Sequence, residues 1–187
     1  MLNNYLRFSP QYDLVIKLLI SSVFTCSLGP LVIKTEGILP ITLQTLFLLF
    51  FAIAFGWQVG GLNALLYTLF GMAGLPIFSG YVGGYENVIG QSGGFFFGFI
   101  AASLICGFLT DFEFSKNPFG HFGNWLLGHA IILVMGAFWL KSFRPDQYMN
   151  DLRNVLPGAA IKSSLGFLVM TILIRLLAGR KDFYLKK

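Results

Sequence analysis

The composition of this 187-residue chain is that of a membrane protein. Hydrophobic residues make up 56% of it and charged residues only 11%, whereas a water-soluble domain carries about a quarter charged residues. The formal net charge is +5. No basic patch interleaved with aromatic side chains lies outside the apolar stretches, which excludes a nucleic-acid-binding protein. We therefore attribute the excess of basic residues to the orientation of the chain in the membrane. Cys26 and Cys106 lie in apolar stretches without metal-ligand spacing, so no metal site is expected.

Six apolar stretches predict six transmembrane helices in one domain over residues 1–187. In chain order they cover approximately residues 13–33, 41–55, 62–74, 93–109, 125–140 and 155–178. A helix that crosses a bilayer needs about 20 residues, so the shorter second and third stretches are expected to form a hairpin of helices around a tight turn. The predicted fold class is an all-α membrane protein of six transmembrane helices, with a Gly-rich capping loop between helices 3 and 4.

The loop over residues 75–92 is unusually rich in glycine and has one charged residue, Glu86. Glycine permits tight turns and close approach of the backbone to a ligand, and long loops of this kind are often lids or binding loops. The pattern predicts a glycine-lined cap over a site between membrane helices. The glycines of this cap and of the following helix start are Gly80, Gly83, Gly84, Gly90, Gly93 and Gly94.

The distribution of basic residues predicts the orientation in the membrane. Six spans place both termini on one side, and the Lys and Arg residues of that side are Arg7, Lys116, Arg175, Arg180, Lys181, Lys186 and Lys187. The other side has Lys34, Lys141, Arg144 and Arg153. Since basic residues concentrate in the cytoplasm, we expect cytoplasmic termini and an external Gly-rich loop.

Four blocks of sequence, in order and at matching spacing, carry a family resemblance. They read PITLQTLF at 40–47, GLPIFSG at 74–80, GQSGGF at 90–95 and PGAAIK at 157–162. Together they resemble the BioY family, the biotin-binding membrane components (S-components) of energy-coupling-factor (ECF) vitamin importers. The usual family form of the third block is GPTGGY, so Gln91 and Phe95 are departures, while Ser92 keeps the hydroxyl.

The resemblance implies biotin uptake at a bacterial cytoplasmic (inner) membrane. The chain would capture biotin outside and deliver it inward with an ECF transmembrane coupling subunit and a pair of ABC-type ATPases, because it contains no ATP-binding motif of its own. No cofactor and no enzymatic activity are implied. In this family the first helix is thought to dock the coupling subunit through small residues, here Ser22 and Cys26; internal helix packing is the alternative for the same residues.

Among the single residues, Lys162 is the strongest candidate for a ligand contact. A cation inside a membrane helix is usually paired or functional, although a lysine near a helix end can also extend its ammonium to the interface. The resemblance implies that Lys162 binds the carboxylate of biotin. Family members commonly read P-G-D-x-x-K here, but the acidic position is Ala159, so the Asp–Lys pair cannot form. We hypothesise that Glu86 takes the place of this aspartate as the partner of Lys162.

Other polar and aromatic residues are predicted to line the ligand site. The ureido ring of biotin has two N–H donors and a carbonyl acceptor, which amide and hydroxyl groups complement, and a helix N-terminus offers free N–H groups. Solvated loop positions, interhelical hydrogen bonds and close helix packing are the alternative interpretations. With Lys162 and Glu86, the predicted ligand-binding set comprises Gln44, Tyr67, Phe78, Tyr85, Asn87, Ser92, Gly93 and Gly94.

Three other functions stay open. The chain could be an S-component for a biotin relative or another vitamin, or a non-transport accessory membrane subunit. An intramembrane enzyme would have to use His129, Ser92 or Asp111, and the sequence shows no set of nucleophile, base and orienting group on facing spans. For His129 we expect an interhelical hydrogen bond, since polar groups at membrane depth need partners.

Overall fold

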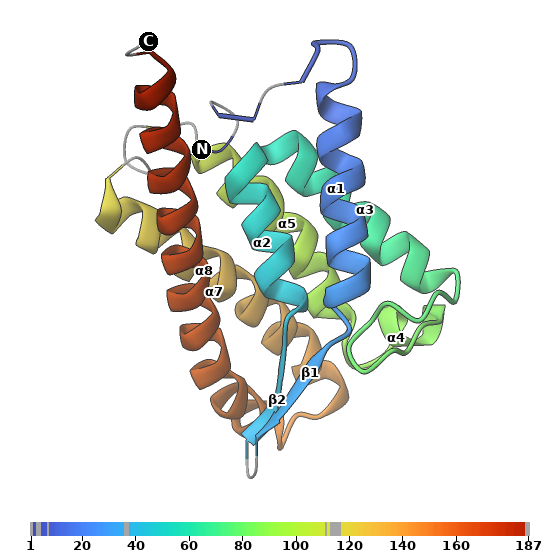
Figure 1. The fold of residues 1–187 in the computed structure, drawn as a ribbon. Coiled ribbons are helices and arrows are strands. Elements are labelled where there is room, and N and C mark those ends of the chain that lie inside the picture. The colour runs from blue at the N-terminus through green and yellow to red at the C-terminus, as the bar shows by residue number, and fades with distance from the viewer. Residues whose placement is uncertain are drawn as a thin grey trace.

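The structure, a computed structural model, describes residues 2, 5–6, 8–35, 38–110, 112 and 117–185. Figure 1 shows a helical bundle with one small β-hairpin. The elements in chain order are α1 (Asp13–Leu28), β1 (Val32–Thr35), β2 (Ile38–Thr42), α2 (Gln44–Phe55), α3 (Trp57–Met72), α4 (Tyr85–Ile89), α5 (Gly93–Leu109), α7 (Pro118–Phe143) and α8 (Tyr148–Leu185).

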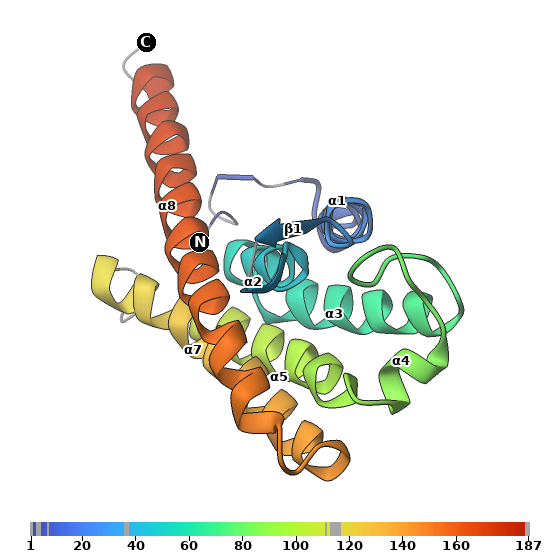
Figure 2. The ribbon, with the colours of Figure 1, turned by 90° about the horizontal axis from the view of Figure 1, so that it is seen from below.

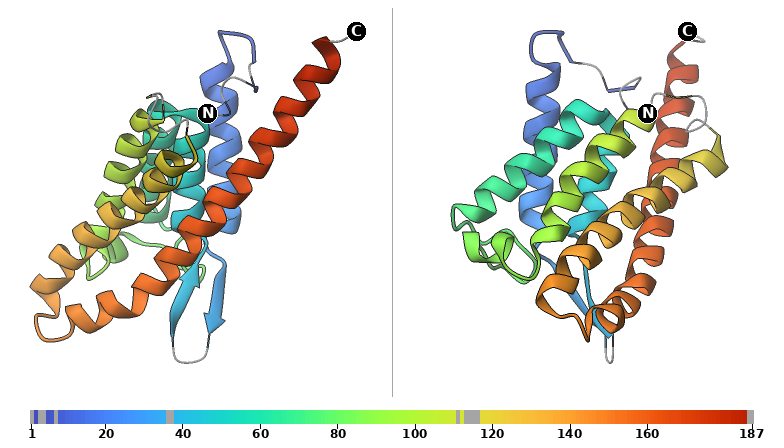
Figure 3. Two further views of the ribbon diagram at one scale, coloured as in Figure 1. Left: turned by 90° about the vertical axis from the view of Figure 1, so that its left-hand side faces the viewer. Right: turned by 180° about the vertical axis from the view of Figure 1, so that it is seen from behind.

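The long helices alternate in direction. The start of α1, the α2–α3 turn and the end of α8 lie at one end of the bundle, and the β1–β2 hairpin, α4 and the α7–α8 turn lie at the other (Figure 1). Helices α3, α5, α7 and α8 pack in that order, each against the next, and α1 and α2 lie against α3 (Figures 2 and 3). The two ends of the described chain are therefore on the same side, as the even number of predicted spans requires.

Several helix boundaries differ from those predicted. Helix α5 has the predicted bounds. Helix α3, in contrast, begins at Trp57, directly after Gly56, whose φ of +93° interrupts the helical conformation between α2 and α3. Helix α7 begins at Pro118, where the side chain of Asn117 accepts a hydrogen bond from the amide of Gly120 at 2.6 Å. Proline is well suited to a first helical turn. Apolar stretches mark only the hydrophobic part of a helix, so these polar ends were missed.

The connector after the first helix forms a short antiparallel hairpin, an element that was not predicted, within a fold that is otherwise helical as predicted. Strand β1 pairs with β2 through Val32↔Thr42, Ile33↔Ile41 and Thr35↔Ile38. With two strands, both are edge strands, and edges are where a proline such as Pro40 is tolerated. The sequence signal was weak because the strands have four and five residues.

Glycines allow α5 and α7 to approach closely. A Cβ atom placed on Gly98 would lie 3.0 Å from Cα of Ile132, and one on Gly136 would lie 2.3 Å from Cε1 of Phe95. On the next helix of the row, a Cβ on Gly166 would lie 2.3 Å from the fully buried ring of Trp125. Small residues at such contacts are typical of helices that pack in membranes.

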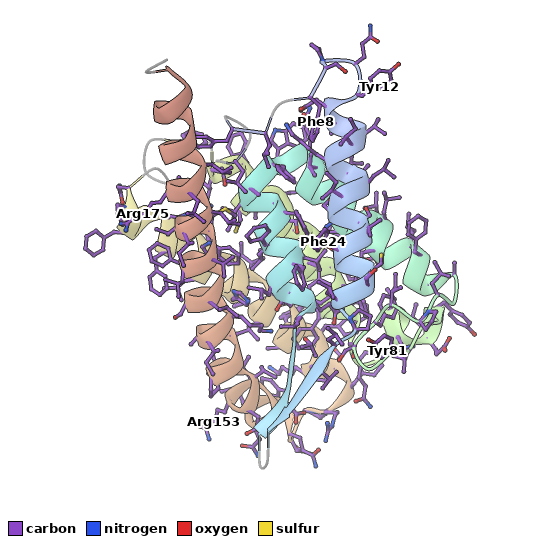
Figure 4. All side chains as sticks on the ribbon, in the orientation of Figure 1. Phe8, Tyr12, Phe24, Tyr81, Arg153 and Arg175 are labelled. Atoms are coloured by element: carbon purple, nitrogen blue, oxygen red, sulfur yellow. The ribbon has the colours of Figure 1, made fainter. Side chains whose placement is uncertain are left out.

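The outer surface of the bundle is apolar. Helices α7 and the part of α8 at 148–178 are each long and apolar enough to cross a membrane, and α2 and α5 are shorter apolar helices. Large hydrophobic side chains stand outward along α1, including Phe24 (Figure 4). Those with at least a third of their surface exposed on α1 are Leu14, Val15, Leu19, Ile20, Val23 and Phe24. A continuous apolar exterior of this kind marks contact with lipid or with other proteins.

Candidate ligand site

A cavity of about 290 Å³ lies between the starts of α2 and α5, the loop around α4, and helices α7 and α8. Small-molecule pockets begin at about this volume, and most are apolar with a few polar groups that orient the ligand. The described residues that line it are Thr42, Gln44, Thr45, Phe78, Ser79, Val82, Asn87, Ser92, Phe95, Phe96, Phe99, His129, Ile132, Leu133, Asn154, Val155, Gly158, Ala159 and Lys162.

Lys162 is the cation of this cavity. Its Nζ donates a hydrogen bond to Oγ1 of Thr45 on α2 at 2.6 Å, and it contacts no carboxylate within the described part of the chain. Ala159, which lies one helical turn earlier, also lines the cavity and is 7% exposed. Because the charge of Lys162 has only a neutral partner, an anion in the cavity would be stabilised by it.

The loop before α4 supplies an aromatic wall. The ring of Phe78 lies 4.4 Å from that of Phe96 and fits against Gly71, where a Cβ would come within 2.0 Å of it. Tyr67 lies behind this wall and does not line the cavity. Its hydroxyl donates to the carbonyl of Ile77 at 2.6 Å, and its ring is 5.6 Å from that of Phe78. Tyr67 therefore fixes the loop that carries Phe78.

Of the three ligand contacts predicted on helix α4, Asn87 lines the cavity. Nδ2 of Asn87 donates to the carbonyl of Gly83 at 2.8 Å, and this orients the amide so that its Oδ1 is the atom left to accept a hydrogen bond. Tyr85 and Glu86 are exposed and lie outside the cavity lining. The structure thus gives no geometric support to ligand contacts by Tyr85 and Glu86, or to Glu86 as a partner of Lys162.

At the start of α5, Ser92 lines the cavity, whereas Gly93 and Gly94 pack against another helix. Ser92 occupies the N-cap position without a side-chain capping bond, so its hydroxyl is available on the cavity wall. Gly93 and Gly94 are buried against Trp139, where a Cβ on Gly94 would lie 2.3 Å from the Trp139 Cβ. Nε1 of Trp139 also donates to the carbonyl of Gly90 at 2.9 Å. These contacts match the packing alternative for the two glycines, which do not line the cavity.

Two positions at the start of α2 bring amide and hydroxyl groups to the cavity. Gln44 is 5% exposed, and its side-chain amide makes no hydrogen bond within the described residues. Thr45 is the partner of Lys162. Sequence reasoning singled out Gln44 but not the full lining. Among the polar lining residues absent from the predicted set are Thr42, Thr45, Ser79, His129 and Asn154.

His129 has the interhelical hydrogen bond that was predicted, and it also lines the cavity. Its Nδ1 is 2.9 Å from Oγ of Ser163 on α8 and 3.1 Å from the carbonyl oxygen of Trp125. It makes no hydrogen bond to Ser92 among the described contacts, and Asp111 lies outside the described residues. His129 and Ser92, two of the residues named for an intramembrane enzyme, are therefore not hydrogen-bonded to each other in the described part of the chain.

The two residues predicted to dock a partner are turned inward. The hydroxyl of Ser22 donates to Oδ1 of Asn63 on α3 at 3.1 Å, and Nδ2 of Asn63 donates to Oγ1 of Thr25 at 3.0 Å. Cys26 is half-buried and packs against the hydrophobic core. The geometry at Ser22 and Cys26 thus favours internal packing, which was the alternative to partner docking.

Comparison with known proteins identifies the family. A sequence model described as the BioY family matches residues 7–179. The chain belongs to the BioY family. Among curated proteins it is 32% identical over 121 residues to the biotin transporter BioY of Thermotoga maritima, covering 64% of this chain and 67% of that protein. It is 36% identical over 117 residues to the biotin transporter BioY2 of Lactococcus lactis, covering 62% and 63% respectively.

The fold is also that of a solved structure. The crystal structure of the S-component for biotin from an ECF-type ABC transporter superposes with a TM-score of 0.78, at 24% identity over 91% of this chain and 95% of that one. In this BioY chain, the position where family members commonly have the aspartate of P-G-D-x-x-K is Ala159, which faces the cavity together with Lys162. The departure from the family pattern thus lies inside the candidate site.

Proposed function

We propose that this BioY-family chain takes up biotin, and that it binds biotin in the cavity between α2, α4, α5, α7 and α8. The observation that carries the proposal is the ammonium of Lys162, which lies in a largely apolar cavity with a neutral partner, Thr45. A ligand with an apolar body and a single carboxylate would complete that arrangement. Similar proteins named as biotin transporters support the choice of biotin.

The cavity groups complement biotin part by part. The carboxylate would pair with Lys162, which gives a charge-assisted hydrogen bond of the stronger kind. Amide groups of Asn87 and Gln44 suit the ureido ring, and Ser92 is a further hydroxyl partner. The apolar thiophane ring and valerate chain would pack against a wall formed by Phe78, Phe96, Phe99 and Ile132, each less than 5% exposed.

The proposed setting is a bacterial cytoplasmic membrane crossed by α1, α2, α3, α5, α7 and α8. The apolar exterior and the glycine-mediated helix contacts support this arrangement. Many of the lining residues lie near the starts of α2, α5 and α8 and in the loop around α4. Those segments lie toward the end of the bundle that carries the β1–β2 hairpin and α4, opposite the ends of the chain (Figure 1). With cytoplasmic termini, that end faces outward, where an importer must capture its ligand. The Gly-rich loop would then act as the cap.

The proposed partners are an ECF transmembrane coupling subunit and a pair of ABC-type ATPases. Binding alone cannot concentrate a ligand, so accumulation of biotin requires an energy source. The sequence contains no ATP-binding motif, and the similar solved structure is described as an S-component of an ECF-type ABC transporter. Cells that express the chain with such a module should accumulate biotin, whereas omission of the ATPase pair should abolish accumulation against a gradient.

Equilibrium binding of tritiated biotin to the purified chain in detergent tests the function. Saturable binding that unlabelled biotin displaces, and that riboflavin and thiamine do not displace, is the expected result. Stronger displacement by dethiobiotin or a biotin ester would reassign the chain to a biotin relative. Absence of vitamin binding together with stable co-purification of transporter subunits would favour the accessory-subunit alternative.

A further inference from the structure

One ring nitrogen of His129 lies within hydrogen-bond distance of two neighbours, and the other has no partner among the described residues. The ring belongs to a side chain that is 3% exposed and lines the cavity. Nδ1 lies within hydrogen-bond distance of Ser163 and of the Trp125 carbonyl. Nε2 is buried and makes no hydrogen bond to any described residue. A buried polar atom without a partner is destabilising, and a ligand group that donates to Nε2 would relieve that cost.

The neighbours of Nδ1 determine which nitrogen carries the proton. The carbonyl oxygen of Trp125 can only accept a hydrogen bond, and it is 3.1 Å from Nδ1. Two lone pairs facing each other at that distance would repel, so Nδ1 carries the hydrogen and donates it. The hydroxyl of Ser163, 3.3 Å from the same carbonyl and 2.9 Å from Nδ1, is consistent with this tautomer. In a neutral imidazole the other nitrogen, Nε2, is then an acceptor.

Among the polar side chains of the residues that line the cavity, His129 is unusual because Nε2, its nitrogen without a partner among the described residues, is a fixed acceptor. Apart from Asn87, whose amide is oriented by its bond to the Gly83 carbonyl, and Thr45, which accepts from Lys162, the amides and hydroxyls of the lining can donate or accept by rotation. Lys162 can only donate. Nε2 of His129 can only accept, and its ring is fixed by α7 and α8. A ligand that brings an N–H group to this point gains a hydrogen bond, whereas a ligand without one leaves the buried nitrogen unpaired.

We propose that His129 is a specificity residue, which selects ligands by accepting a hydrogen bond from a ring N–H. The inference rests on the proposed function. In biotin the only N–H groups are those of the ureido ring, so His129 would accept from one of them while Lys162 binds the carboxylate. Sites that hydrogen-bond a substrate N–H strongly reject analogues without it, because the buried protein group is then left unpaired.

Calorimetric titration of the full-length chain tests the inference with three variants. His129→Leu removes the acceptor, His129→Gln keeps a carbonyl that can accept near the position of Nε2, and Ser164→Ala is the matched control. Ser164 is the exposed neighbour of Ser163, and its hydroxyl donates to the Ala160 carbonyl of its own helix. We expect His129→Leu to weaken biotin binding by about tenfold or more. The Gln variant and the control should stay within about threefold of wild type.

Biotin methylated at one or the other ureido nitrogen separates a ligand contact from a structural role. One of the two isomers should bind wild type at least about tenfold more weakly than biotin, and His129→Leu should lose most of that discrimination. If His129→Leu binds biotin as tightly as wild type, or if all variants discriminate between the isomers equally, the inference is wrong while the proposed function stands. If wild type does not bind biotin, the proposed function fails and the inference fails with it.

Discussion

Replacement of Lys162 by Met should separate ligand affinity from protein stability. The ammonium of Lys162 has one neutral hydrogen-bond partner, Thr45 at 2.6 Å, and no carboxylate among the described residues. In the free protein this part-buried charge is therefore poorly compensated, and its removal by an apolar side chain of similar length relieves a desolvation cost. We expect the melting temperature of Lys162→Met without ligand to equal or exceed that of wild type.

Biotin binding should change in the opposite direction. Loss of one partner of a desolvated charge pair costs about 2–5 kcal/mol, and the contact here is part-buried, so the lower part of that range applies. A loss of about 2–3 kcal/mol corresponds to a roughly 30- to 150-fold weaker affinity. Biotinamide, which has no carboxylate, should bind wild type and Lys162→Met with nearly equal affinity.

Isothermal titration of both proteins with both ligands measures this coupling, and a thermal melt of each protein without ligand measures stability. Thr45→Val is the matched variant, since it removes the neutral partner of Lys162 but keeps the charge. It should bind biotin far better than Lys162→Met. Lys162 is not the partner of the carboxylate if Lys162→Met binds biotin within about threefold of wild type, or if the substitution weakens binding of biotin and of biotinamide equally.

Three further predictions concern the loop and the helix contacts. Tyr67→Phe leaves the buried Ile77 carbonyl without its donor, so it should lower stability by about 1–3 kcal/mol in denaturant unfolding; an unchanged midpoint would contradict the anchoring role. Gly94→Ala places a Cβ 2.3 Å from Trp139 and should cost about 1–3 kcal/mol of stability by overpacking, whereas a variant that melts as wild type would refute this. Ser22→Ala removes the bond to Asn63 and should leave co-purification with a coupling subunit intact; loss of the complex from a folded variant would restore Ser22 as a docking residue.

The long helices could largely be predicted because each has an apolar stretch, whereas the short helix α4 lies inside the predicted loop over residues 75–92 and was missed. The sequence motifs contain several of the residues that line the candidate cavity. The polar ends of α3, α7 and α8 were missed because a cap such as Asn117 and a break such as Gly56 are single residues. The hairpin was missed because two short strands give little periodic signal.

Prediction of the site was limited by side-chain direction. Residues that are close in the chain can point in different directions. Asn87 lines the cavity, whereas Tyr85 and Glu86 do not. Likewise Ser92 lines the cavity, whereas Gly93 packs against Trp139. A sequence block locates a segment, but which residue of the segment faces inward depends on its helical phase and on partners that are distant in the chain. Thr45, which contacts Lys162 across 117 positions of sequence, is such a partner.

Titration of biotin into wild type and into a variant with the cavity filled tests whether biotin binds in this cavity. Ala159→Phe introduces a large side chain at a lining position on α8 that is 7% exposed. We expect saturable binding of one biotin per wild-type chain and no binding by the variant, with both proteins folded by thermal melt. Equal binding by both proteins would contradict binding in this cavity, as would a wild-type chain that binds no biotin.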